Sequence, residues 1–379
     1  MSDIEIFVPF GLPPAEHAAD LLRELQLPAL AMLLARARRL PIPASPVVER
    51  DADASADWAR GSRCLDSQHD GFARALPHEM WLARHFGLAD PTHPDNSPPV
   101  AAALMRTCGI RPDPGHWFIV QPVHYHVARD HLVLTDPRAL GLADGDARAL
   151  FATALRSFEQ AGLELRYGNA DYWFVRADRH RDLLTATPDA TCGHNIHIWM
   201  PEGTSARAWR KLQNEVQMDW HTHSVNAART EAGRTPVNSL WLWGGAGVPT
   251  ETASKAAARA ESLFNFQGWY AAFGQYTSSS TIVPDADAQT LLASSEPHRF
   301  VMLDSLIGPA LAGDWASWLE YMRMFEVSWF GPILRALHKG DIASISLIVN
   351  HNTRLRQWRT NRNGLRKIWQ KPALNRLLS

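Results

Sequence analysis

Two spacings of apolar residues recur along the chain. Short apolar runs bounded by Gly, Pro or Asp are typical of buried strands, and they cover residues 4–10, 239–247, 298–303 and 344–349. Longer stretches with apolar residues at helical spacing cover residues 15–40, divided by Pro28, then 251–265 and 313–340. Strands that alternate with helices predict an α/β fold with a mostly parallel sheet covered by helices.

The pattern changes between residues 109 and 187. A strand, turn and strand over 116–136 precede an amphipathic helix over 146–162, and a hairpin pattern over 163–178 turns at Gly168-Asn169. This order predicts a small α+β domain of its own. We therefore expect an inserted domain at 109–187 within a core made of residues 1–108 and 188–379.

Composition points to an ordinary globular protein. Of 379 residues, 46% are hydrophobic and 20% charged, and the formal net charge of −1 favours neither nucleic acid nor an acidic surface. The end of the chain is different, because eight Lys or Arg and no Asp or Glu follow from Arg354 onward. Trp358 and Trp369 lie among them, so single-stranded nucleic acid is one possible ligand. The commoner arrangement, which we expect, is a C-terminal helix with Trp on the core and Arg in solvent.

The cysteines and the first residues bear on location. Cys64, Cys108 and Cys192 are odd in number and far apart, which predicts reduced thiols in a cytoplasmic protein. The N-terminal segment has two early acids and no basic region, unlike a signal peptide. No apolar run reaches the roughly 18 residues that cross a bilayer. We expect no membrane association.

The segment NAARTEAGRTPVNSLWLWGGAG, residues 226–247, carries the most distinctive spacing. Its glycines, Gly244 and Gly247 among them, predict either a tight structural turn or a close approach of backbone to a ligand. The spacing is neither a Walker A loop nor a G-x-G-x-x-G fingerprint. Arg229 would serve either as a clamp for phosphate or carboxylate or as a surface ion pair.

Histidines near strands form the other candidate group. His124, His126 and His131 fall in the strand-turn-strand pattern, and their apolar neighbours favour half-buried sheet residues over a metal corner. Asn350 and His351 directly follow the last apolar run. Open α/β sheets bind ligands at the carboxyl ends of their strands, where Asp-His would indicate a metal pair. Here the first residue is Asn.

The order of these segments resembles the archaeal-type cofactor-independent phosphoglycerate mutases of the alkaline phosphatase superfamily. PHEMWLARHFGL, residues 77–88, resembles the family's nucleophile segment. Residues 226–247 resemble its pattern N-x-x-R-x-x-x-G-x-x-x-N-x-x-W-x-x-G-x-G, with one residue of slack, at Asn226, Arg229, Gly233, Asn238, Trp243, Gly244 and Gly247. The resemblance implies an alkaline-phosphatase-like three-layer sandwich with a small inserted domain. It extends to bacterial proteins labelled either as mutases or as regulatory proteins.

The resemblance also implies two divalent metal ions and a phosphorylated serine, and few of the corresponding residues remain. The serine position falls near His78, beside Glu79, and the final Asp-His pair falls on Asn350 and His351. The other ligand positions fall on Pro9, Asp304, Pro309 and Gly313. Only His351 is kept and Asp304 is a substitute, so we expect neither a metal centre nor another cofactor.

Our hypothesis is a catalytically degenerate, metal-independent protein that regulates or binds a small anion. The ligand would be a phosphorylated small molecule, and a protein partner is also considered. The binding residues would be Asn226, Arg229, Asn238, Gly244, Gly247, Asn350 and His351. The alternative is a phosphoryl-transfer enzyme of mutase or phosphatase type, in which His78 accepts the phosphoryl group or acts as general base, helped by Glu79.

Overall fold

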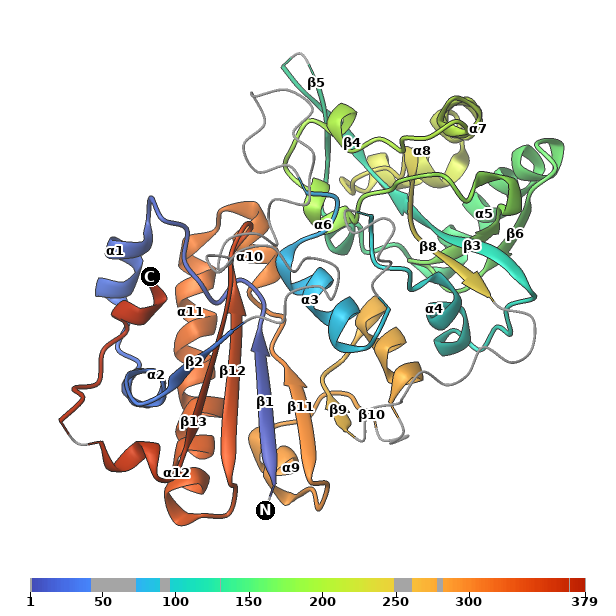
Figure 1. Ribbon diagram of the computed structural model, residues 1–379. Coiled ribbons are helices and arrows are strands. Elements are labelled where there is room, and N and C mark those ends of the chain that lie inside the picture. The colour runs from blue at the N-terminus through green and yellow to red at the C-terminus, as the bar shows by residue number, and fades with distance from the viewer. Residues whose placement is uncertain are drawn as a thin grey trace. The chain divides into compact units, whose positions relative to one another are not determined.

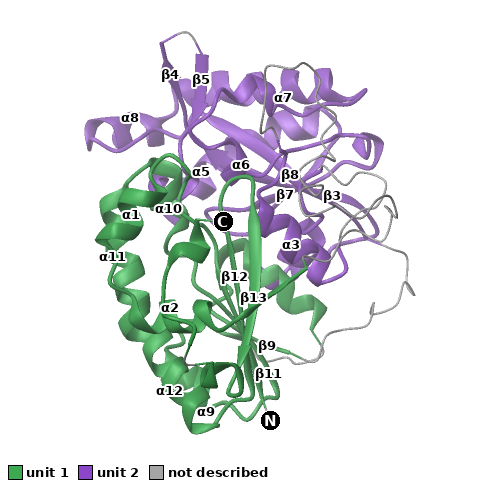
Figure 2. Cartoon of the chain, turned by 60° about the vertical axis from the view of Figure 1, so that its left-hand side comes forward, with its two compact units in different colours: residues 1–60, 257–379 green, residues 61–256 purple. Residues whose placement is uncertain are grey.

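The computed structural model describes residues 2–41, 73–88, 96–129, 131–248, 261–277, 282–367 and 369–378. The chain forms two compact units, one from residues 1–60 and 257–379 and the other from residues 61–256 (Figures 1 and 2). We call them unit 1 and unit 2 and describe each by itself.

A seven-stranded sheet forms the centre of unit 1 (Figure 1). Pairing is parallel from β10 to β12 and antiparallel for the last two strands. The interior strand β12, which has a neighbour on each side, is buried along its whole length. The predicted α/β class with a mostly parallel sheet is confirmed. In spatial order the strands are β10 (Ile282–Val283), β9 (Ser262–Phe264), β11 (His298–Met302), β1 (Asp3–Val8), β12 (Ser344–Asn350), β13 (Leu355–Asn361) and β2 (Arg38–Leu40).

The helices of unit 1 follow the predicted periodicity. Pro28 begins a new helix, because its fixed φ and missing N–H suit the first helical turn. The run over 313–340 is interrupted by one π-turn at Glu326, whose carboxylate accepts hydrogen bonds from the N–H groups of Ala29 (2.6 Å) and Leu30 (3.1 Å). Glu326 thereby caps a helix distant in sequence. The helices are α1 (Ala18–Glu24), α2 (Pro28–Ala35), α9 (Ala288–Ala293), α10 (Ile307–Ala312), α11 (Trp315–Phe325), the π-helix η6 (Glu326–Phe330) and α12 (Gly331–Lys339), with 3₁₀ turns η5 (Gly268–Tyr276), η7 (Gly364–Arg366) and η8 (Asn375–Leu377).

Unit 2 contains an antiparallel four-stranded sheet, in the order β6 (Glu164–Tyr167), β7 (Trp173–Arg176), β3 (Gly115–Val123) and β8 (Ser239–Val248). Two long helices, α5 (Asp144–Gln160) and α7 (Ala206–His221), bury their apolar faces in one core with this sheet. Large aromatic residues fill that core, among them Phe118, Phe158, Trp173, Trp209 and Trp220.

The predicted insert at 109–187 lies within unit 2, which is wider than that range. The sheet extends beyond it because β3 pairs antiparallel with β8. The expectation that residues 239–247 join the parallel sheet was wrong. The remaining elements of unit 2 are α3 (Pro77–His85), α4 (Ala101–Thr107), β4 (Tyr125–Ala128), β5 (His131–Leu134), α6 (Pro188–Thr191), α8 (Ser224–Glu231) and the 3₁₀ turns η2 (Pro137–Leu140), η3 (Asp178–His180) and η4 (Ile196–Ile198).

Two further expectations need correction. The basic end of the chain does not begin as a helix, since residues from Leu355 onward form β13, which pairs antiparallel with β12. Its Trp358 is buried as expected, but Trp369 is 74% exposed. Of the predicted helix over 251–265, residues 251–260 lie outside the described residues, and the following Ser262–Phe264 is strand β9.

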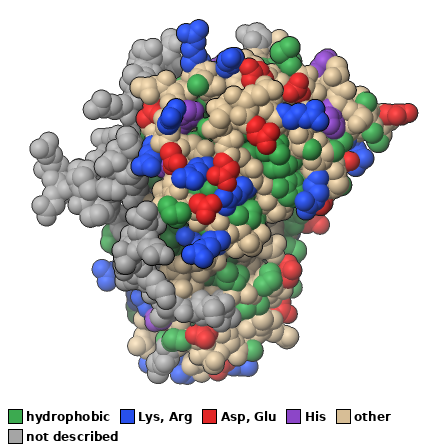
Figure 3. Space-filling view, turned by 90° about the vertical axis from the view of Figure 1, so that its right-hand side faces the viewer, with side chains coloured by type: hydrophobic (Ala, Val, Ile, Leu, Met, Phe, Trp, Pro, Cys, Tyr) green, Lys and Arg blue, Asp and Glu red, His purple; other side chains and the backbone are tan. Residues whose placement is uncertain are grey.

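The surface drawn in Figure 3 carries acidic and basic side chains side by side. Ion pairs in unit 2 show the same mixing, for example Arg166 with Asp113 and Glu164, and Arg176 with Asp178. Exposed pairs of this kind stabilise a fold only slightly. In the part of the chain that the structure describes, no helix has both the length and the apolar character needed to cross a membrane.

Candidate functional site

The carboxyl ends of β1 and β12 are held together by Asn350. Its Oδ1 accepts a hydrogen bond from the backbone N–H of Phe10 (3.3 Å), and its Nδ2 donates to the carbonyl of His351 (3.1 Å). Phe10 lies in the left-handed region, with φ 58°, and its carbonyl accepts a hydrogen bond from the Trp318 indole (2.9 Å). The Asn350 amide therefore stabilises the tight turn that follows β1, and the side chain is completely buried.

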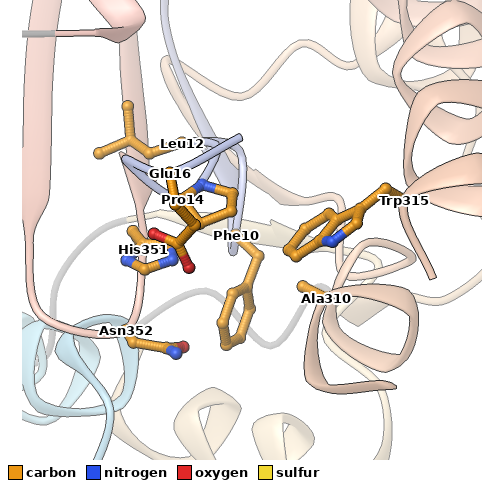
Figure 4. Close-up of a pocket in the computed structure, with 8 residues that line it drawn as sticks. All are labelled: Phe10, Leu12, Pro14, Glu16, Ala310, Trp315, His351 and Asn352. Carbon is orange, nitrogen blue, oxygen red and sulfur yellow. The ribbon is translucent and has the colours of Figure 1, made fainter. Parts of the chain in front are cut away.

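A small pocket lies at this edge of the sheet (Figure 4). Its volume is about 100 Å³. In Figure 4 the Phe10 ring lies between the Trp315 indole and the side chains of His351 and Asn352. The lining residues come from the loop after β1, from α10 and α11, and from the turn after β12, and they are Phe10, Leu12, Pro14, Glu16, Ala310, Trp315, His351 and Asn352.

His351 is the titratable imidazole of this pocket. Burial lowers its pKa below the usual value, the charge of Arg354 lowers it further, and Glu16 acts in the opposite direction. The ring is therefore neutral at pH 7 and presents both a donor and an acceptor. Together with the Asn352 amide it suits a small polar ligand.

The other predicted metal positions do not complete a ligand set here. Asp304 follows β11 and is half-buried, whereas Pro309 and Gly313 lie within and just after α10. Among the described residues, the groups of three or more His, Cys, Asp or Glu donors close enough to share a metal ion do not include Asp304 or His351. At the carboxyl ends of β1 and β12, the described candidate metal ligands are therefore isolated residues rather than a cluster.

A second group of titratable residues is buried in unit 2, at the start of α3. Glu79 accepts hydrogen bonds at Oε2 from the Leu76 N–H (2.6 Å) and from the Thr187 hydroxyl (2.7 Å). His78 and Glu79 are both completely buried. Donor atoms of His78, Glu79 and Asp189 all lie within 4.8 Å of one another. The structure therefore brings the two predicted catalytic residues together with a third one, Asp189 of α6.

Arg138 neutralises Asp189 in this group. Its Nη2 and Nη1 donate to the two carboxylate oxygens of Asp189, at 2.8 and 3.1 Å. This bidentate pairing is the strong geometry for Arg and carboxylate. Neither Asp189 nor Arg138 was predicted from the sequence, because no spacing pattern relates them to His78.

Burial sets the charges in this group. It raises the pKa of Glu79 to about 8, and the nearby Asp189 charge raises it as well. It lowers the pKa of His78 to about 3, helped by the positive charge of Arg138. At neutral pH both side chains are therefore uncharged. Glu79 Oε1 is buried and has no hydrogen-bond partner among the described residues.

The chemistry available to this group is limited by its burial. Imidazole and two carboxylates are a suitable donor set for a divalent ion. However, the Arg138 guanidinium already supplies a positive charge to Asp189, so a metal ion would compete with it. His78 has no exposed surface in this structure, whereas a phosphoryl acceptor must reach its donor.

The predicted ligand residues Asn226 and Asn238 both bind backbone groups. Asn226 donates to the carbonyls of Trp220 (2.9 Å) and Val237 (2.7 Å) and accepts from the Val237 N–H (2.8 Å). Asn238 accepts from the N–H and donates to the carbonyl of Tyr125, each at 2.8 Å. The Asn226 amide links α8 to the loop that follows it, and the Asn238 amide links β4 to the residue before β8. Their observed role is structural.

Arg229 is buried in the same region and also binds backbone. Its Nε donates to the carbonyl of Thr235 (2.8 Å) and its Nη2 to that of Leu140 (2.5 Å). Burial lowers its pKa, and Arg234 adds to the effect. Arg229 thus donates to carbonyl oxygens, which differs from both the phosphate clamp and the surface ion pair considered for it.

The glycines after Trp243 continue strand β8 and allow β3 to approach closely. A Cβ on Gly244 would lie 2.8 Å from Ile119 Cδ1, and one on Gly245 would lie 2.4 Å from Phe118 Cε1. The register of β3 shifts at this point, between Trp117 and Ile119. Gly244 has φ 71°, and its N–H donates to the Ser97 hydroxyl (2.9 Å). The segment is an irregular strand rather than a turn.

The histidines of the β3–β5 region are spread along their strands. His124 Nδ1 lies 2.9 Å from the Pro236 carbonyl, and His126 Nδ1 lies 3.2 Å from the Thr135 hydroxyl. With His131 they are half-buried or exposed. None of the three belongs to a potential metal-binding group among the described residues.

Comparison with known proteins gives partial matches. No family model matches the chain. It is 26% identical over 137 residues to a 2,3-bisphosphoglycerate-independent phosphoglycerate mutase of Methanosarcina barkeri, covering 33% of this chain and 32% of that protein. It is 32% identical over 66 residues to the protein of the same name from Methanosarcina mazei, covering 17% of each.

The chain thus spans about a third or less of the length of these curated relatives. Among solved structures, the PH0037 protein from Pyrococcus horikoshii matches with a TM-score of 0.50 at 13% identity, covering 95% of this chain and 87% of that one. This likeness concerns the fold. Over the matched segments, the chain is homologous to cofactor-independent phosphoglycerate mutases.

Proposed function

We propose that this chain is a phosphoglycerate-mutase-like protein that binds a small phosphorylated ligand and does not perform two-metal phosphoryl transfer. The observation that carries the proposal is the role of Asn350. Its amide holds the turn at Phe10 and the carbonyl of His351, at the strand edge where the resemblance places a metal-ligating carboxylate.

Charge balance supports the loss of the two-metal reaction. Two metal ions stabilise the attacking and leaving oxygens of an in-line displacement, and carboxylates must hold those ions. The neutral Asn350 amide brings no negative charge for a metal ion, and its Oδ1, the atom that could ligate one, accepts the hydrogen bond from the Phe10 N–H. Pro9, at the end of β1, has no ligand atom in its side chain. The remaining Asp304, Glu16 and His351 do not form a cluster among the described residues.

A binding role is supported by the pocket at the same edge. Its volume of about 100 Å³ suits a group of a few non-hydrogen atoms, such as a phosphoryl group. His351 and Asn352 offer hydrogen-bond donors there, and the charge of Arg354 acts on His351. Ligand binding without turnover is the basis of many regulatory proteins, so we assign this chain to that class.

The alternative is phosphoryl transfer through His78. A neutral imidazole next to Glu79 favours it, because the neutral ring has a nucleophilic nitrogen. The complete burial of both side chains opposes it. Incubation with a phosphodonor followed by mass spectrometry separates the two proposals, since only the alternative gives a phosphorylated His78 that disappears in His78→Gln.

The experiment that tests the main proposal combines activity with binding. The chain is assayed for interconversion of the two phosphoglycerate isomers in the presence of Mn²⁺, and titrated calorimetrically with phosphoglycerate in the presence of EDTA. We expect saturable binding without turnover. Turnover that depends on the metal ion would contradict the proposal, and so would the absence of both binding and turnover.

A further inference from the structure

The strands β2 and β13 bring arginines together at one end of the unit 1 sheet. Arg39 pairs directly with Trp358 across the two strands, and Arg356 pairs with Val349 of β12. Side chains alternate along a strand, so Arg356 and Trp358 point to the same face. Directly paired residues also share a face, which places Arg39 there.

A third arginine lies at the end of the same strand. Arg354 ends the turn after β12, and its carbonyl accepts a hydrogen bond from the His351 N–H (2.8 Å). Arg354 directly precedes β13 and lies two residues before Arg356, so the alternation of side chains places both arginines on the same face. We call Arg39, Arg354 and Arg356 the arginine cluster.

The charges of these groups act in the direction that the strand register implies. Arg356 is half-buried, and its pKa is lowered first by burial and then by the charges of Arg39 and Arg354. Among the described residues, the charges that act on the Arg356 guanidinium thus include two other cations, and its Nη1 donates a hydrogen bond to the carbonyl of Leu355 (3.1 Å). The opposite face is different, because Arg359 donates there to Asp3 (3.1 Å). Like charges gathered on one face are unfavourable for folding.

The arginine cluster adjoins the pocket through Arg354. The same guanidinium charge that acts on Arg356 also lowers the pKa of His351, which lines the pocket. The indole of Trp358, which is 3% exposed, lies on the same face of the sheet as the cluster. A positive group of this kind, beside neutral donors, is suited to an anion.

We infer that Arg39, Arg354 and Arg356 bind the dianionic phosphoryl group of a small phosphorylated ligand. Guanidinium groups present paired N–H donors that match the oxygens of a phosphoryl group. Three guanidiniums more than balance its two negative charges. This inference rests on the proposed function and deepens it, since it names the residues that would select the ligand. These residues differ from the set expected from the sequence.

The test uses the full chain and inorganic phosphate as probe, titrated calorimetrically at low ionic strength in the presence of EDTA. In the double variant Arg39→Gln/Arg354→Gln we expect the affinity to fall about tenfold or more, as for loss of charged hydrogen bonds. Arg366→Gln serves as the matched control, because Arg366 is exposed in η7, outside the cluster. Its affinity should be unchanged. Thermal unfolding of each variant checks that it is folded.

Several outcomes would overturn the inference. One is that the parent chain binds no phosphate, and another is that the double variant binds as tightly as the parent. A third is equal weakening in Arg366→Gln, which would indicate general charge attraction. Tight binding of a single-stranded oligonucleotide that excludes phosphate would assign the cluster to another ligand class. Metal-dependent mutase activity would refute the proposed function separately, because it is measured without reference to these variants.

Discussion

The Oδ1 atom of Asn350 accepts a hydrogen bond from the backbone N–H of Phe10, over 3.3 Å. This contact joins the ends of two neighbouring parallel strands. It holds Phe10 in a left-handed conformation that is uncommon for a residue other than glycine. The position that would carry a metal-ligating carboxylate by resemblance is therefore used to stabilise the fold.

Replacement of Asn350 by Asp tests this role. The second carboxylate oxygen would face the carbonyl of His351, which now accepts a hydrogen bond from Nδ2. We expect the free energy of unfolding to fall by about 1–3 kcal/mol or more, since the pair is buried. Urea denaturation measures it. Asn352→Asp, at an exposed neighbour, should change stability little, and equal stability of both variants would contradict the assigned role.

The glycines of β8 provide a matched pair of substitutions. Gly245→Ala would place a Cβ 2.4 Å from the Phe118 ring, whereas Gly247→Ala meets no atom within 4 Å. Overpacking typically costs about 1–3 kcal/mol. We expect a lower thermal midpoint for Gly245→Ala and nearly no change for Gly247→Ala. A loss of phosphate binding in a stable Gly247→Ala variant would instead support the ligand role expected from the sequence.

Glu326 is predicted to stabilise α2 from outside that helix. Its carboxylate accepts hydrogen bonds from the first N–H groups of α2 and opposes the positive end of the helix dipole. Glu326→Ala should lower the free energy of unfolding by about 1 kcal/mol, as for loss of an N-cap. Glu320→Ala is the control, since Glu320 is exposed on α11. Chemical denaturation distinguishes the two.

The buried pair in unit 2 should make stability depend on pH. Between the usual pKa of 4.5 and the raised value of about 8, folded Glu79 holds a proton that the unfolded chain has released. Stability therefore falls as pH rises through this interval, by up to about 1.4 kcal/mol per pH unit. His78 has the opposite effect between about 3 and 6.5, because there the unfolded chain holds the extra proton.

The two effects cancel where the intervals overlap, so a net loss is expected between pH 6.5 and about 8. Urea midpoints across this range measure it. Glu79→Gln should remove the loss, because Gln does not titrate, whereas His78→Gln should extend it down to about pH 4.5. A parent chain whose stability does not change from pH 6.5 to 8 would contradict the buried, protonated state of Glu79.

The sequence predicted the elements well where a single period dominates. The strand at 344–349 and the helices divided at Pro28 are local patterns, and the structure has them. Partners of the strands were harder to predict. Residues 239–247 have the same apolar pattern in either sheet, and only their pairing with β3 decides the outcome. Residues after Arg354 are rich in Arg and Trp, but pairing with β12 makes them a strand.

Candidate sites were predicted from residue type and resemblance, which do not reveal hydrogen-bond partners. Asn226 and Asn238 match the family pattern, yet their amides bind backbone groups within unit 2. His78 and Glu79 were predicted, but their neighbours Arg138 and Asp189 come from distant segments. The arginine cluster depends on the register between β2 and β13, which no local pattern specifies.

The central claim is that no two-metal centre forms at the edge of β1 and β12. It is tested most directly by the metal content of the purified chain, measured by mass spectrometry after dialysis against manganese, zinc and magnesium. We predict less than about a tenth of an equivalent per chain, because the carboxylates that hold such ions are missing. One or two tightly held ions per chain that are lost in Asp304→Asn or His351→Ala would contradict the claim.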